Sequence, residues 1–147
     1  MPLNLTYVKA SEVKAEELAN IRVEAMRPSL LAVGRFDPDR AKRRFLDTFS
    51  ASDTTIIQHG TLTIGFFVLR RRPNDLYLDH LYVLHNYQRL GVGGNVIKLV
   101  KDEARPTQKP IRLMALKGSP ANQFYLRLEF CLIQEDEFDN HYMWNPQ

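Results

Sequence analysis

The stretch Gln88-Arg89-Leu90-Gly91-Val92-Gly93-Gly94 decides the fold of this chain. A strand is expected before it, at residues 76–84, and a helix after it, with an apolar side formed by Val92, Val96, Leu99 and Val100. Glycines let the backbone turn its N–H groups inward and let an anion approach without a Cβ in the way. The helix start adds unpaired donors and partial positive charge, which suits a pyrophosphate. Glycines before a helix also merely shape turns, and that alternative stays open.

The spacing of these glycines excludes two common phosphate-binding motifs. The dinucleotide fingerprint requires a third glycine three residues after the second, where this chain has Val96. The phosphate loop of nucleotide hydrolases requires Gly-Lys-Ser/Thr, which does not follow here.

Patterns on both sides of the glycine stretch predict the element order β-α-α-β-β-β-α-β-α-β-β. Four helices are expected. The first begins at Ser11 and is disturbed by Pro28, and the second begins at Asp37-Pro38. The third runs from Val92 to Arg105-Pro106, and the fourth covers about 121–128. Strands are expected at 3–8, 54–58, 61–69, 76–84, 111–116, 131–138 and 141–144. The strand at 111–116 follows a β-α-β connection and should pair parallel with 76–84. We expect one α/β domain over residues 1–147, with a mixed sheet covered by helices on both faces.

Composition is typical of a soluble domain, which we expect in the cytoplasm. Apolar residues make up 44% and charged residues 25% of the chain. No apolar run approaches the roughly 20 residues of a membrane span, and the start lacks the features of a secretory signal. Cys131 is the single cysteine, which excludes an internal disulfide and a multi-cysteine metal site. We therefore expect no metal and no membrane partner.

The net charge of +3 is mild, and the tight basic cluster is Arg70-Arg71-Arg72. It leads into the turn signal Pro73-Asn74-Asp75, so a solvated hairpin end is the first interpretation. Contact with an anion, either a phosphate or RNA, is the alternative. We expect no nucleic-acid partner.

Three features together resemble the GNAT superfamily of N-acetyltransferases. The glycine stretch matches the family motif Gln/Arg-x-x-Gly-x-Gly/Ala, residues 81–87 look like its strand ending and bend, and residues 122–130 resemble its fourth helix. The element order agrees over nearly the whole chain. The resemblance implies a mixed sheet whose two central parallel strands splay apart. It also implies acetyl transfer from acetyl coenzyme A, or a longer acyl donor, to the amine of a small molecule or peptide.

The resemblance also implies roles for particular residues. Backbone groups of Leu81 and Val83 would bond the pantetheine arm. Asn122 would approach the pantetheine or the acceptor, and Tyr125 would protonate the departing thiolate. The pyrophosphate would be held by the backbone N–H groups of Gln88, Arg89, Leu90, Gly91, Val92, Gly93 and Gly94. Glu129 stands where the family commonly has glycine. Because Glu is disfavoured in the left-handed conformation that glycine accepts, we expect the helix end to differ. The direction of the Tyr125 side chain is then expected to differ as well. A packed, half-buried aromatic is the alternative for Tyr125.

The residue that takes the amine proton stays open. Period two places Tyr77 and Asp79 on the strand face of Leu81 and Val83, so Asp79 is a base candidate in the predicted cleft. An ion pair with an arginine such as Arg112 is the alternative. His80 lies on the other face and is expected to pack, and His85 is expected at the surface.

Glu24 is the second base candidate, with Met26 and Arg27 lining the acceptor pocket that the resemblance implies near the first helix. The alternative for Glu24 is a solvated position on the helix surface. The amine could also lose its proton to solvent, without a base from the protein. The four carboxylates of residues 135–139 either attract a cationic amine or form an ordinary charged hairpin end. An acyl coenzyme A binding module without transfer activity is the alternative function, an RNA-binding domain a distant third, and a homodimer stays open.

Overall fold

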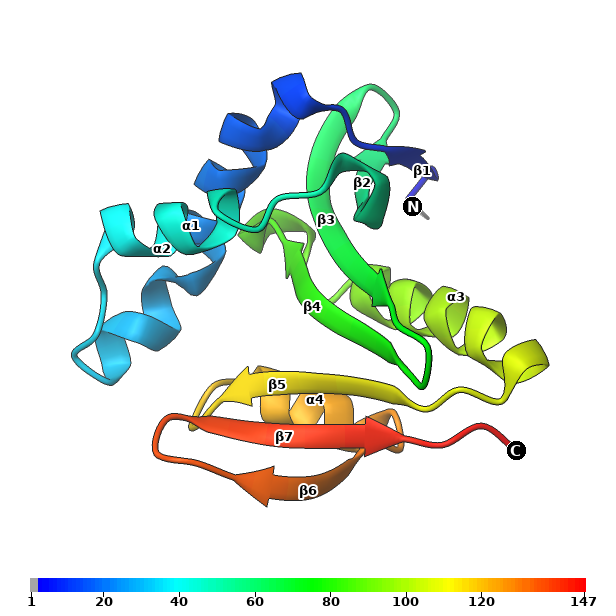
Figure 1. Ribbon diagram of the computed structural model, residues 1–147. Coiled ribbons are helices and arrows are strands. Elements are labelled where there is room, and N and C mark those ends of the chain that lie inside the picture. The colour runs from blue at the N-terminus through cyan, green and yellow to red at the C-terminus, as the bar shows by residue number, and fades with distance from the viewer. Residues whose placement is uncertain (1–2) are drawn as a thin grey trace. The chain divides into compact units, whose positions relative to one another are not determined.

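The computed structural model describes residues 3–147 (Figure 1). Its seven strands form a mixed sheet in the order β1-β2-β3-β4-β5-β7-β6. The strands are β1 (Leu5–Lys9), β2 (Thr54–His59), β3 (Leu62–Arg71), β4 (Leu76–Val83), β5 (Ile111–Leu116), β6 (Cys131–Glu135) and β7 (Asp139–Trp144). The α-helices are α1 (Ala15–Ala32), α2 (Pro38–Leu46), α3 (Val92–Thr107) and α4 (Ala121–Arg127). Short 3₁₀ turns occupy Glu12–Lys14, Ala51–Asp53 and His85–Tyr87. The predicted α/β class with a mixed sheet is confirmed.

The chain divides into two compact units, each built from two stretches of sequence. Unit 1 contains the residues up to Val68 together with His80–Gly93, and unit 2 contains Leu69–Asp79 and Gly94–Gln147. None of the helices formed by residues 3–147 combines the length and the apolar character that a membrane crossing requires.

Unit 1 packs α1 and α2 on the strands β2 and β3. The Asp37 side chain accepts a hydrogen bond from the Arg40 N–H and Pro38 follows at the first helical position, so α2 begins as predicted. Phe45 of α2 contacts Phe66 of β3 edge to face, with ring centroids 5.2 Å apart. The buried cluster around them consists of Leu18, Ala19, Ile21, Phe45, Ile56, Phe66 and Val68.

Unit 2 packs β5 between β4 and β7. β5 pairs parallel with β4, as the β-α-β connection predicts, and antiparallel with β7. The buried side chains of unit 2 include Leu76, Leu78, Val96, Ile97, Val100, Ala104, Ile111, Leu113, Tyr125, Phe130, Tyr142 and Trp144. Strand β6 is exposed along its length and carries Cys131 at the edge of the sheet.

The parallel ladder between β4 and β5 is short. It pairs Leu76 with Ile111, Tyr77 with Arg112 and Leu78 with Leu113, and β4 then continues to Val83. Burial alternates along β4 from Leu76 to Asp79, and the following residues to Val83 are all half-buried. The predicted period-two pattern therefore holds only for the first half of the strand.

Two helix ends differ from the prediction, because neither Pro28 nor Pro106 stops its helix. A proline removes one backbone donor, and an exposed proline leaves room for its ring. α1 ends instead at Ala32, just before Gly34, whose φ of 70° permits bonds from the Gly34 N–H to the Leu31 carbonyl and from the Arg35 N–H to the Leu30 carbonyl. A left-handed glycine was the stronger stop signal.

Candidate active site

The turn after β4 is fixed by bonds within unit 1. The Leu84 N–H donates to the Ile64 carbonyl at 2.8 Å, which holds the strand end against β3. The Gln88 side-chain Nε2 donates to the Val83 carbonyl at 2.9 Å. The Gln88 side chain therefore ties the glycine stretch to the end of the strand, a contact that the motif alone did not predict.

Two left-handed residues shape the stretch itself. Arg89 has a φ of 64° and Gly91 a φ of 85°, with Leu90 between them. Alternation of right-handed and left-handed residues can turn successive N–H groups toward one side, as in anion-binding backbone nests. Residues from Gln88 to Gly91 are exposed, and buried Val92 begins α3. A Cβ built on Gly94 would meet no other atom within 4 Å, so the start of the helix is open. The backbone geometry fits a pyrophosphate.

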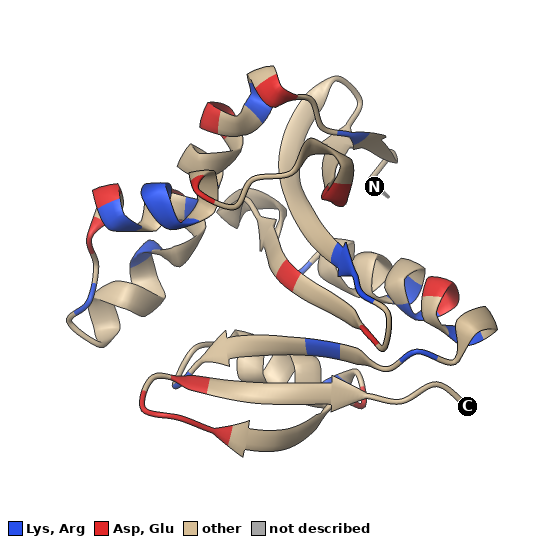
Figure 2. Cartoon of the chain, in the orientation of Figure 1, with Lys and Arg blue, Asp and Glu red and all other residues tan. Residues whose placement is uncertain are grey.

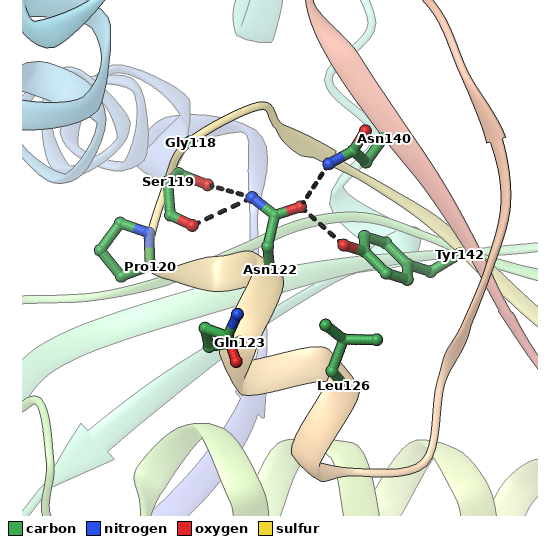
Figure 3. Close-up of a pocket in the computed structure, with 8 residues that line it drawn as sticks. All are labelled: Gly118, Ser119, Pro120, Asn122, Gln123, Leu126, Asn140 and Tyr142. Atoms are coloured by element: carbon green, nitrogen blue, oxygen red, sulfur yellow. Dashed lines mark hydrogen bonds between the residues drawn. The ribbon is translucent and has the colours of Figure 1, made fainter.

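Asn122 is the centre of a polar network in unit 2 (Figure 3). Its Nδ2 donates to the Leu116 carbonyl at 2.9 Å and to the Ser119 carbonyl at 3.0 Å. Its Oδ1 accepts from Asn140 Nδ2 at 2.9 Å and from the Tyr142 hydroxyl at 2.7 Å. These bonds occupy both amide hydrogens and both oxygen lone pairs. Asn122 thus joins α4 to β5 and β7, and its contact with cofactor or acceptor stays a prediction.

The same network borders a pocket of about 500 Å³. All eight residues that line it are uncharged, namely Gly118, Ser119, Pro120, Asn122, Gln123, Leu126, Asn140 and Tyr142. Asn140 Oδ1 is buried and has no hydrogen-bond partner among residues 3–147.

Tyr125 is buried, rather than half-buried as its alternative interpretation had it. Its ring contacts Phe124, Phe130 and Tyr142, with centroids 5.1, 5.6 and 6.4 Å away. The expected change of the helix end is wrong, because Glu129 adopts the left-handed conformation with a φ of 73°. The Phe130 N–H bonds to Tyr125 and the Glu129 N–H to Leu126, which is the bonding of a left-handed helix cap. The helix therefore keeps the left-handed cap that glycine usually forms. This helix end gives no reason to expect another direction for the Tyr125 side chain.

Asp79 forms an ion pair, with a partner other than the one considered from sequence. Its Oδ2 accepts from Arg70 Nε at 3.2 Å and Nη2 at 3.1 Å. Arg112 instead contacts Asp75, with Nε 3.4 Å from Oδ2. Arg112 lies on β5 opposite Tyr77, close to the start of β4, and Asp75 directly precedes that strand.

Tyr77 lies in the same charged region of unit 2. The Arg72 guanidinium sits over its ring, 4.6 Å from the centroid. Burial raises the pKa of Tyr77, and the nearby Asp79 carboxylate raises it further, so the phenol stays protonated at neutral pH.

The basic cluster forms carboxylate pairs in unit 2. Arg71 binds Glu103 at 2.6 Å and Arg72 binds Asp75 at 2.6 Å, while the Arg72 N–H closes the hairpin onto the Asp75 carbonyl. The predicted hairpin end is confirmed.

Glu24 and Arg27 pair with each other on the exposed face of α1. Arg27 Nη2 lies 2.8 Å from Glu24 Oε1, and its guanidinium lies 4.6 Å from the Phe36 ring centroid. The hydrogen bond from Arg27 holds the pKa of the Glu24 carboxyl below its usual value, which makes Glu24 a weaker base. A solvated helix face describes both residues.

The two histidines of the β4 region lie where the sequence predicts. His80 packs edge to face on Phe45 at 5.3 Å, and its Nδ1 is 2.8 Å from the Tyr82 hydroxyl. His85 is exposed.

His141 is a candidate functional residue that the sequence pattern did not single out. Its Nε2 is 2.8 Å from Asp136 Oδ2, which forms a histidine–carboxylate pair in the β6–β7 hairpin. This hydrogen bond lowers the pKa of Asp136. On β7, His141 pairs with Met114 of β5. The sequence signal for the histidine–carboxylate pair was Asp136, five residues before His141.

Comparison with known proteins places this geometry in a family. A family model described as the acetyltransferase (GNAT) domain matches residues 19–146. The chain belongs to the GNAT acetyltransferase family. It is therefore an acyltransferase, and the resemblance seen in the sequence is confirmed.

Solved structures share the fold at low sequence identity. The PaiA N-acetyltransferase of Thermoplasma acidophilum, crystallised with coenzyme A, has a TM-score of 0.76 and 15% identity over 97% of this chain and 99% of that chain. An acetyltransferase of Thermus thermophilus has a TM-score of 0.75 and 12% identity over 97% of each chain. Ard1 of Thermoplasma volcanium has a TM-score of 0.71 and 15% identity over 97% of this chain and 98% of that chain. No curated protein matches the sequence.

Proposed function

We propose that this acetyltransferase uses acetyl coenzyme A to acetylate an amine of a small molecule or peptide. The carrying observation is the Gln88–Gly94 turn, where left-handed Arg89 and Gly91 precede the start of α3. Backbone N–H groups of this turn would hold the pyrophosphate. The structure of PaiA with coenzyme A, in a protein of the same fold, supports this donor.

The reaction we propose is direct attack of the amine nitrogen on the thioester carbonyl carbon. The new C–N bond forms a tetrahedral intermediate, which collapses as the C–S bond breaks and the thiolate leaves. Tyr125 would give the thiolate a proton, and its burial keeps bulk water from its ring. Leu81 and Val83 would bond the pantetheine through backbone groups. Asp79 would accept the amine proton, and Tyr77 is the proposed acceptor contact of unit 2. Glu24 and Arg27, on the exposed face of α1, are the proposed acceptor contacts of unit 1.

Thiol release from acetyl coenzyme A tests the proposal. The panel should contain polyamines, aminoglycosides, amino acids and peptides with free N-termini. We expect release above background with at least one class. Binding of acetyl coenzyme A with no release for any amine would instead indicate a binding module without transfer activity.

A further inference from the structure

The β6–β7 hairpin holds a histidine and a carboxylate in contact, and the proposed reaction uses neither of them. His141 Nε2 lies 2.8 Å from Asp136 Oδ2. The other oxygen, Asp136 Oδ1, accepts from the backbone N–H groups of Phe138 at 3.2 Å and Asp139 at 2.9 Å. The turn itself therefore fixes the carboxylate that meets the imidazole. Figure 2 shows acidic residues gathered at the β6–β7 connection.

The contact with Asp136 decides which nitrogen of His141 can act as a base. An ionised carboxylate only accepts, so the neutral imidazole carries its proton on Nε2 and its lone pair on Nδ1. Nδ1 forms no hydrogen bond within residues 3–147. The His141 side chain is 25% exposed, so the ring is not sealed from ligands or water. An imidazole oriented by a carboxylate is the arrangement of a general base.

Strand pairing places His141 on the sheet face that carries Tyr77 and Asp79. Tyr77 of β4 pairs with Arg112 of β5, and Met114 of β5 pairs with His141 of β7. Arg112 and Met114 are two residues apart, so they and their partners face the same side. Asp79 follows two residues after Tyr77, in the part of β4 where burial alternates. Met114 is 46% exposed, so this face is open beside His141.

The strands beside His141 present it with neutral side chains. Its cross-strand partners are Met114 on β5 and Gln134 on β6. Arg112, the charged residue of β5 on this face, pairs with the Asp75 carboxylate instead, with Nε 3.4 Å from Oδ2. Asp139 lies two residues before His141 on β7, and its backbone N–H bonds to Asp136. Among residues 3–147, Asp136 is the charged group that bonds to the imidazole.

A protonated amine loses two protons from its nitrogen during acetyl transfer. The first must leave before attack, because its departure frees the lone pair, and the second leaves after the C–N bond has formed. The proposed function names one acceptor, Asp79, whose Oδ2 already receives two hydrogen bonds from Arg70. Free imidazole titrates near neutral pH and a free carboxyl group roughly 2–3 units lower. An imidazole is therefore the stronger base toward an ammonium group.

We propose that His141 is a further catalytic residue, which takes the first proton from the acceptor ammonium, and that Asp136 is its positioning residue. The inference rests on the proposed acetyl transfer. The ammonium N–H bond breaks as an Nδ1–H bond forms, and the nitrogen keeps the electron pair with which it attacks the thioester carbon. The imidazolium then releases its proton to solvent. Asp79 accepts the second proton, which balances the one that Tyr125 gives to the thiolate.

Thiol release from acetyl coenzyme A tests this step, with spermidine, neomycin, lysine and a peptide with a free N-terminus as acceptors. Rates are measured between about pH 7 and about pH 10, a range that approaches the titration of an ammonium group. His141→Asn should lower kcat/KM roughly 10²-fold at about pH 7. The deficit should shrink as the pH rises, because solvent then supplies neutral amine. A purely structural defect would lower the rate equally at every pH.

Asp136→Asn tests the positioning role while preserving the turn. The amide keeps an oxygen for the Phe138 and Asp139 N–H groups and presents an N–H group to His141. The imidazole must then accept at Nε2 and carry its proton on Nδ1, the wrong tautomer for a base. We expect the same pH-dependent loss as in His141→Asn. Glu137→Gln makes the matched change at an exposed carboxylate of the same hairpin and should leave the rate unchanged.

Rescue by added imidazole separates a missing base from a damaged hairpin. His141→Ala should regain part of its lost activity with imidazole, whereas Asp136→Asn should not, because its own ring still fills the site. Melting temperatures of the variants control for damage to the fold. An active wild type with unchanged rates in His141→Asn, or with a loss that is the same at every pH, would overturn the inference and leave the proposed function intact. Absence of thiol release from the wild type with every acceptor would instead count against the proposed function.

Discussion

Tyr125 carries the proposed acid role, so the smallest test removes its hydroxyl. Tyr125→Phe should lower turnover by roughly 10²-fold, the low end for losing a positioned acid. Affinity for acetyl coenzyme A should barely change, because the ring and its contacts with Phe124 and Phe130 remain. Initial rates and a binding titration measure the two effects. Unchanged turnover would show that Tyr125 is only a packed aromatic.

Asp79 is the proposed base, although it forms an ion pair with Arg70. Asp79→Asn keeps the shape and removes the basicity, so turnover should fall by about 10²–10⁴ while cofactor binding survives. Activity limited by amine deprotonation should also rise with pH. A pH–rate profile of the wild type and the variant measures both expectations.

Glu24→Gln provides the control, since it makes the same small change at the competing base. The exposed Glu24–Arg27 pair predicts little effect on turnover. If Glu24→Gln abolishes turnover and Asp79→Asn does not, the base is Glu24. If neither changes turnover, the amine loses its proton to solvent before it binds.

At the level of elements, the end of α4 stores conformational strain at Glu129. A side chain in the left-handed region costs about 1 kcal/mol, which glycine avoids. Glu129→Gly should therefore raise the free energy of unfolding by roughly 1 kcal/mol, reduced in part because glycine gains freedom in the unfolded chain. Urea unfolding measures the change. Glu137→Gly, at an exposed position in the β6–β7 connection, is the comparison and should give no such gain. A lower stability for Glu129→Gly would mean that attraction between Glu129 and Lys101 outweighs the strain.

For the whole molecule, binding of acetyl coenzyme A should stabilise the fold because the unfolded chain has no site. At 100 times its dissociation constant the gain should be about 2.7 kcal/mol. Gly93→Val should remove most of this gain by placing branched methyls against the pyrophosphate. A thermal-shift titration reads out both proteins, and the melting temperature without ligand controls for damage to the fold. Equal stabilisation of the two proteins would refute the pyrophosphate assignment.

Several features of this protein follow from local sequence alone. The glycines at 91, 93 and 94 and the following helix pattern predicted the turn and α3, because backbone freedom and helix capping depend on neighbouring residues. The Asp37-Pro38 start of α2 and the strand Ile111–Leu116 were predicted for the same reason. The GNAT family followed from motif and element order together.

Only the tertiary structure decided which distant side chains meet. Arg70, rather than Arg112, binds Asp79, because strand pairing places Arg112 beside Tyr77 near Asp75. Asn122 bonds to Leu116, Asn140 and Tyr142, which come together only when β5, β7 and α4 pack. Glu129 was expected to change a helix end that packing of Phe130 on Tyr125 preserves. Local preferences thus determined where elements begin, while the free energy of packing chose side-chain partners and overrode the weak preference of one residue.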